Sequence, residues 1–194
     1  MITKFGGQPN WLEEPQWPIS KTTGKPMQFI CQIVLDKVLF PNAIGTIAYI
    51  FMADDSDSGL AITWEYEGGD NAVIIQHGIV PSFVKISKNN ESNILEKEYR
   101  VFCSYQNEPD YIKEVDELPQ EESDMYFNSL HYTKVGGTPA FLQGDNFPKG
   151  ENWNLLCKLE SSKMPFDANF GDCGTAYAFI NSDGTEGRFM WQCY

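Results

Sequence analysis

The sequence predicts a mainly β protein, bordering on α+β, built as two similar β-rich lobes related by a pseudo-twofold axis. Three observations predict this fold class. The motif KFGGQPNW at 4–11 returns as KVGGTPAF at 134–141, short runs of β-branched and aromatic residues alternate with turn residues, and helical periodicity is sparse. At 194 residues the chain is expected to form one compact domain, 1–194, with few short helices.

The repeat extends well beyond the opening motif. Pairs of identical or similar residues follow one another in the same order in both parts, among them Trp17 with Phe147, Cys31 with Cys157, and Tyr49 with Tyr177. A collinear series with small gaps is hard to obtain without duplication. We therefore assign 3–66 and 133–194 to two copies of one unit, and 67–132 to a dissimilar segment that joins them.

Each copy opens on a Gly-Gly-x-Pro turn. Two adjacent glycines permit positive φ, and the proline fixes the bend that follows. We expect these turns to be structural. Their residues are Gly6, Gly7 and Pro9 in the first copy and Gly136, Gly137 and Pro139 in the second.

After the turn, each copy shows the pattern of one strand followed by a hairpin. The expected strands are 27–35, 45–52 and 60–66 in the first copy, and 152–159, 174–180 and 188–194 in the second. Cys31 and Cys157 lie mid-strand among apolar residues, so we expect buried, inert thiols. The run 54–57 (DDSD) fails the calcium-loop spacing and is expected to be a hairpin tip.

The joining segment continues the strand pattern and then becomes acidic. Strands are expected at 73–77, 81–86 and 98–105, completing the first sheet. The stretch 108–124 holds eight acidic residues against Lys113 alone. We expect a short helix at 110–118 and a solvated connector over most of the stretch.

Charge and composition restrict the classes of partner. A net charge of −13 and a pI near 4.4 disfavour nucleic-acid binding and favour a basic partner. No apolar run approaches the roughly 20 residues that span a bilayer, and the first residues show no secretory signal. The five cysteines are odd in number and form no C-x-x-C. We therefore expect a cytoplasmic protein with reduced thiols and without metal or cofactor.

Recognisable catalytic motifs are missing from the sequence. Neither of its two histidines lies in a known motif, and the chain lacks the nucleophile-elbow, zincin, P-loop and dinucleotide-binding patterns. The compact cluster that offers chemistry is 171–174 (GDCG), where Asp172 and Cys173 are the candidate catalytic residues. The structural alternative is an Asx-turn at Asp172 that caps backbone donors before the next strand.

The paired Gly-Gly-x-Pro motifs, Trp17-Pro18, the strand at 26–33 and 170–174 (FGDCG) together resemble the bacterial YwqG-like proteins over nearly the whole chain. The opening at 4–12 is also similar to the programmed-cell-death-2-like ribosomal-protein chaperones, although the cysteine-rich metal-binding insertion of that group is missing. The resemblance implies a duplicated β-rich fold without established enzymatic activity. It also implies a protein-binding role, for some members as immunity proteins beside bacterial toxins.

Taken together, these observations predict a non-catalytic module that binds another, basic protein, either neutralising a toxin or chaperoning a client. The expected interface joins exposed aromatic anchors to acidic side chains that speed capture. Its residues are Trp11, Trp17, Phe141, Phe147, Glu114, Asp116, Glu117, Glu121 and Glu122. Two alternatives stay open: an enzyme that uses Asp172 and Cys173, and a sugar-binding protein that stacks its ligand on Trp11 or Trp17. The tryptophans also have a structural interpretation, as clamps that hold their loop on the sheet.

Overall fold

The computed structural model describes residues 1–54, 62–88, 91–150 and 152–194, with the backbone alone at residue 116. Its first sheet contains β1 (Lys4–Gly6), β3 (Gln28–Val34), β4 (Ile47–Met52), β5 (Asn71–Gln76), β7 (Asn93–Ile94) and β8 (Glu98–Arg100). The second contains β9 (Lys134–Val135), β10 (Trp153–Glu160), β11 (Thr175–Asn181) and β12 (Gly187–Gln192). A small third sheet pairs β2 (Pro18–Ile19) with β6 (Lys85–Ile86), and the helical elements are η1 (Val115–Glu117), α1 (Gln120–Ser129) and η2 (Ser161–Lys163). The mainly β fold class is confirmed.

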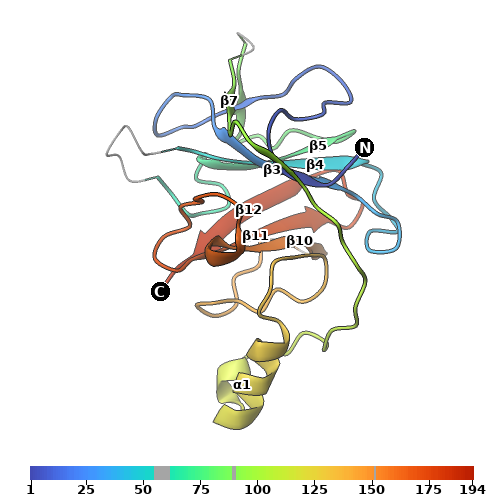
Figure 1. The fold of residues 1–194 in the computed structure, drawn as a ribbon, viewed down its shortest axis with the longest axis vertical. Helices are drawn as coiled ribbons and strands as arrows, with labels where there is room; N and C mark the ends of the chain where they lie inside the picture. The colour runs from blue at the N-terminus through green and yellow to red at the C-terminus, as the bar shows by residue number, and fades with distance from the viewer. Residues whose placement is uncertain (55–61, 89–90, 151) are drawn as a thin grey trace.

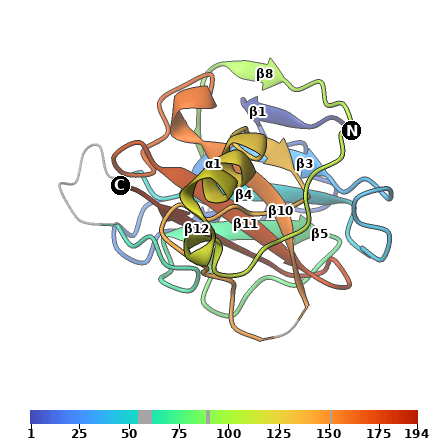
Figure 2. The same ribbon diagram turned by 90° about the horizontal axis from the view of Figure 1, so that it is seen from below.

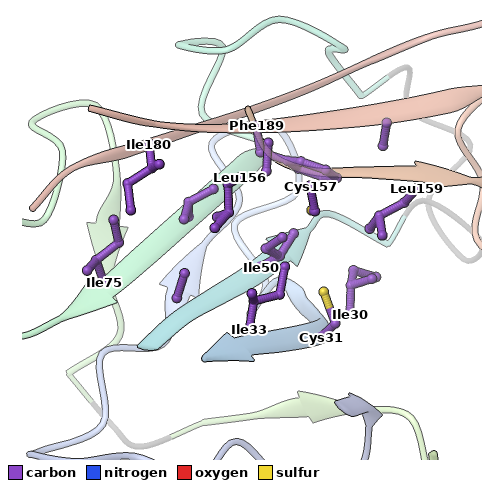
Figure 3. Close-up of a cluster of buried hydrophobic side chains, with 14 of the residues drawn as sticks. Ile30, Cys31, Ile33, Ile50, Ile75, Leu156, Cys157, Leu159, Ile180 and Phe189 are labelled. Atoms are coloured by element: carbon purple, nitrogen blue, oxygen red, sulfur yellow. The ribbon is translucent and has the colours of Figure 1, made fainter. Parts of the chain in front are cut away.

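The two larger sheets stack face to face as a sandwich (Figure 1). Between them lies the largest core cluster, to which β3, β4 and β5 contribute residues such as Ile33 and Ile50, and β10 to β12 contribute residues such as Leu159 and Phe189. Figure 3 shows these side chains pointing into the space between the sheets. Burial of this apolar surface is the main stabilising contribution to the sandwich.

The outer face of each sheet is also covered. Every residue of β4 is buried, as is every residue of β11 except its last. Antiparallel sheets commonly leave one face in water, with strands that alternate apolar and polar residues. Here the chain before β3 covers the first sheet through Trp11 and Trp17, and the chain before β10 covers the second through Phe141.

The two sheets share one strand order. The first runs β5-β4-β3-β1 and the second β12-β11-β10-β9, with antiparallel pairing throughout these strands. Each has a register shift at the corresponding place, between Phe29 and Cys31 in β3 and between Leu155 and Cys157 in β10. The first sheet then continues to β8, whereas the second ends at β9.

Several expected strands are confirmed, while others are wrong. The strands at 27–35, 45–52, 73–77, 152–159, 174–180 and 188–194 correspond to β3, β4, β5, β10, β11 and β12. Residues 62–66 of the expected strand 60–66 form no strand, and β4 pairs with β5 instead. Residues 60–61 and most of the acidic tip at 54–57 lie outside the described residues.

The joining segment also departs from expectation. The strands at 81–86 and 98–105 shrink to β6 and β8, and 101–112 has no regular structure. The helix expected at 110–118 is wrong except for the short η1. The longer α1 begins after Pro119, which occupies its N-cap. Proline favours helix beginnings because it lacks the N–H that would otherwise be unpaired there. In the described part of the chain, no helix is long and apolar enough to cross a membrane.

The Gly-Gly turns have the backbone conformation that the sequence predicts. Gly6 and Gly7 have φ of 61° and 65°, and Gly136 and Gly137 have φ of 72° and 77°. The surroundings of the two turns differ. A Cβ added at Gly6 would overlap the carbonyl oxygen of Lys97, whereas one added at Gly136 would meet only the Leu39 side chain at 3.5–3.7 Å.

We therefore expect Gly6→Ala to be more destabilising than Gly136→Ala. Both changes carry the left-handed backbone strain, about 1 kcal/mol, but only the first also forces backbone apart, for a total of about 3 kcal/mol. Gly24→Ala measures the strain alone, because Gly24 has φ of 69° and no atom within 4 Å of an added Cβ. Urea unfolding of the three variants checks this order, and equal losses at Gly6 and Gly136 would contradict it.

Candidate functional site

Each Lys-x-Gly-Gly turn is held by its own buried lysine. Lys4 Nζ lies 2.5 Å from Glu98 Oε2, and Lys134 Nζ lies 2.7 Å from Glu108 Oε2. A buried ammonium needs a paired counter-charge, because its desolvation is costly. Both carboxylates come from the joining segment. The lysine recurs at the same position of both motifs, and this recurrence is the sequence signal that could have indicated its role.

Glu108 is the more extensively bound of the two carboxylates. It accepts hydrogen bonds from the Thr138 N–H at 2.9 Å, from Lys134 and from the Tyr132 hydroxyl. Burial by itself raises the pKa of Glu108, but these hydrogen bonds outweigh it and hold the pKa below its ordinary value. In its ionised form, Glu108 therefore fastens the joining segment to the second Gly-Gly turn.

The aromatic residues of the two loops pack in matching geometry. Trp11 lies on Tyr49 with ring centroids 4.4 Å apart at 38°, and Phe141 lies on Tyr177 at 5.1 Å and 40°. Trp11 also stacks on Phe51, with ring centroids 6.0 Å apart and an interplanar angle of 14°. Phe141 stacks on Phe179 in the same way, with ring centroids 6.0 Å apart and an angle of 17°. These rings clamp their loops on the outer faces of the sheets.

This packing corrects the expected interface. Trp17 and Phe141 are 4% and 5% exposed, so the expectation that they form exposed anchors is wrong. Burial closes Trp17 to the stacking of a sugar, whereas Trp11 is half-buried in the same cluster, and stacking on Trp11 stays a prediction. Phe147 is 39% exposed but packs edge-on against Phe141. A binding role for Trp11 and Phe147 stays a prediction.

Two buried glutamines hold the same loops by their backbone. Gln76 Oε1 accepts a hydrogen bond from the Leu12 N–H at 2.8 Å, and Gln192 Oε1 accepts one from the Leu142 N–H at 2.9 Å. Neither role was expected, because the first copy was assigned to 3–66, which leaves Gln76 outside the repeat. A longer insertion after β4 aligns Gln76 with Gln192.

The predicted acidic residues lie on a segment that runs down the side of both sheets to α1 (Figure 1). We call the exposed side chains along 102–125 the connector surface. It includes Phe102 at 84% exposure and Met125 at 68%, together with Tyr105, Tyr111, Ile112, Glu114, Glu117, Glu121 and Glu122. The side chain of Asp116 lies outside the described residues. Seen from below, α1 lies in front of the second sheet (Figure 2).

A cleft of about 780 Å³ lies between the two halves. It is lined by 3–5 on one side, by 132–135 on the other and by 101–110 of the connector. Cys31 and Cys157 lie at its inner end, where burial raises the pKa of both thiols. The expectation of buried thiols is confirmed, and these two sulfurs are poor nucleophiles.

A second cavity of about 520 Å³ includes Cys173 in its lining, with His131 and the ion pair of Lys158 and Glu160. Lys158 Nζ lies 3.0 Å from Glu160 Oε1, and both side chains are buried. Cys173 is exposed with φ of 45°. Asp172 does not line this cavity. The Asx-turn expected at Asp172 is formed instead by Asn169, whose Oδ1 accepts the Gly171 N–H at 3.2 Å.

Within the described ranges, no group of three or more His, Cys, Asp and Glu side chains is placed to hold a metal ion. Comparison with known proteins gives a family and no activity. The family model described as a domain of unknown function (DUF1963) matches residues 3–190, a range that includes both Gly-Gly turns and the whole connector. A search of the curated proteins found no match.

We expect Glu108→Gln to destabilise the protein by about 1–3 kcal/mol at neutral pH, because Lys134 would lose its counter-charge. The pKa of Glu108 is depressed in the folded state, so its contribution is present above the unfolded value of about 4.3 and is lost as pH falls through the folded value. Urea unfolding measured from neutral to acidic pH should show that the difference in free energy of unfolding between wild type and variant becomes smaller. Glu96→Gln, at an exposed carboxylate, is the control. A gap that stays constant into acid would contradict this role.

Proposed function

The chain belongs to the DUF1963 family, and we propose that it is a protein-binding module whose connector surface captures a basic partner. The observation that carries this proposal is the exposure of apolar and acidic side chains together on one segment. Large apolar side chains are usually buried, so Phe102, Tyr105 and Met125 in water are candidates for contact anchors.

Several exposed acidic side chains of the connector surface lack a paired basic side chain among the described residues. Lys113, the one basic residue of 108–124, pairs with its neighbour Glu114 at 3.1 Å. Among the side chains that the structure describes, Glu117, Glu121 and Glu122 form no ion pair. Uncompensated charge on a protein of net charge −13 attracts a basic partner and raises its association rate. Toxin neutralisation and chaperoning of a basic client are the two forms that this activity would take.

Neutralising three of these charges should slow association. We expect the triple variant to bind a basic protein, recovered by affinity capture, with an on-rate several-fold lower and an off-rate little changed. It combines Glu117→Gln, Glu121→Gln and Glu122→Gln. The on-rate of the wild type should also fall as salt rises, because the screening length is about 8 Å at physiological ionic strength. Stopped-flow or biosensor kinetics measure both effects.

The matched control removes three exposed charges elsewhere, with Glu91→Gln, Glu96→Gln, Asp167→Asn. It changes net charge by the same amount and should leave the on-rate nearly unchanged. Equal slowing in the two triple variants would mean that overall charge, and not the connector surface, steers the partner. Salt-independent kinetics would contradict the proposal outright.

A second candidate function rests on the cavity beside Cys173. A thiol, the His131 imidazole and the buried pair of Lys158 and Glu160 line one space, and these are the residue types of nucleophilic catalysis. Asp172 lies outside this lining, so the enzyme alternative now depends on Cys173. The binding proposal uses none of these groups.

Replacing Cys173 separates the two candidates. If the protein acts by binding, Cys173→Ser should keep partner affinity and the salt dependence, as should Cys103→Ser at the other exposed thiol. If it acts by catalysis, turnover of the partner or of a small substrate should vanish in Cys173→Ser and persist in Cys103→Ser. Mass spectrometry of the partner before and after incubation distinguishes the two outcomes.

A further inference from the structure

The second sheet ends where the first continues. In the first half, β8 pairs antiparallel with the outer edge of β1, with Phe5 opposite Tyr99. The corresponding strand of the second half is β9, and among the described residues it pairs with β10 alone. The position beside β9 that corresponds to β8 therefore holds no strand.

The backbone groups of this free edge can be assigned. Along an antiparallel strand, successive residues direct their N–H and C=O groups to opposite sides. The Gly136 N–H donates to the Leu156 carbonyl of β10, so the groups of Val135 and Gly137 point away from β10. In the first half the outward groups are paired, since the Gly7 N–H donates to Leu95 and the Thr3 carbonyl accepts from Val101.

Space is available beside this edge. Lys97 leaves no room for a Cβ at Gly6, whereas the atoms nearest to a Cβ at Gly136 belong to the Leu39 side chain at 3.5–3.7 Å. Beside Gly137 the Glu108 carboxylate lies close, so the open part of the edge is at Val135 and Gly136. The cleft of about 780 Å³ lies between β9 and the connector, within the size range of about 300–1,000 Å³ typical of ligand sites. The connector is fastened near this edge through the Glu108 side chain and through the Pro109 carbonyl, which accepts from the Thr138 hydroxyl.

We propose that an extended segment of the basic partner enters this cleft and adds to β9 as an antiparallel strand, as β8 adds to β1. The inference rests on the proposed function and names its binding mode. Unpaired strand edges are templates for such addition, in which main-chain hydrogen bonds supply affinity. The partner's segment is expected to be basic because Asp36 and Asp110 line the cleft. The two lysines that line the cleft, Lys4 and Lys134, are already paired with Glu98 and Glu108. The cleft also adjoins the connector surface through 101–110.

The test uses the full chain and a defined probe, the acetylated and amidated peptide Lys-Val-Lys-Val-Lys-Val. We expect it to bind and to slow hydrogen exchange at the Val135 amide. The same peptide N-methylated at all six residues keeps its charge and side chains but loses the backbone donors of its residues on both strand edges. Its affinity should be at least about tenfold lower, because strand addition depends on those donors.

Val135→Pro supplies the matching change in the protein. Proline removes the outward N–H and blocks an edge without removing a bond to β10. It should weaken the parent peptide by about tenfold, because a carbonyl of the added strand loses the Val135 N–H as its donor. If the variant fails to fold, the two peptides on wild-type protein still decide the matter.

Equal affinity of the two peptides would overturn strand addition. No binding of the parent peptide, or binding without protection at Val135, would also overturn it. The proposed function is tested separately. Suppose that the triple variant of the connector surface captures its partner more weakly, while the two peptides bind with equal affinity. The binding module is then retained, and strand addition is rejected as its binding mode. Unchanged capture in that variant would reject the connector surface.

Discussion

The structure depends on covering the outer face of each sheet with chain that is not itself a strand. A loop laid on a buried face must find partners for its backbone groups, since an unpaired buried N–H is costly. The Gln76 and Gln192 side chains accept the loop N–H groups, and the Tyr49 and Tyr177 hydroxyls donate to loop carbonyls. Packing of aromatic rings then excludes water from each loop. The same arrangement in both halves supports the interpretation that they are copies of one unit.

The joining segment is part of both halves and not a passive link. It supplies Glu98 to the buried Lys4 and Glu108 to the buried Lys134, so each Gly-Gly turn depends on chain that lies outside its own repeat. It also supplies β5, which takes in the first sheet the edge position that β12 takes in the second. The first sheet therefore continues past the boundary expected at residue 66, since its edge strand β5 ends at Gln76.

The surfaces on which we propose binding lie where the two halves differ. The first half closes its sheet edge with β8, whereas the second leaves β9 open beside a cleft. The connector that borders this cleft carries exposed aromatic residues and carboxylates without counter-ions. For a DUF1963 chain whose family description gives no activity, this asymmetry is what supports a binding proposal.

The sequence by itself determined the features that depend on nearby residues. Six strands and the positive φ of Gly6, Gly7, Gly136 and Gly137 follow from local alternation and from backbone sterics. Tertiary structure alone decided which strand pairs with β4, where α1 begins, and that Trp17 and Phe141 are buried. It also decided which carboxylates meet the two lysines. These features depend on contacts between residues far apart in the chain, which local patterns do not encode.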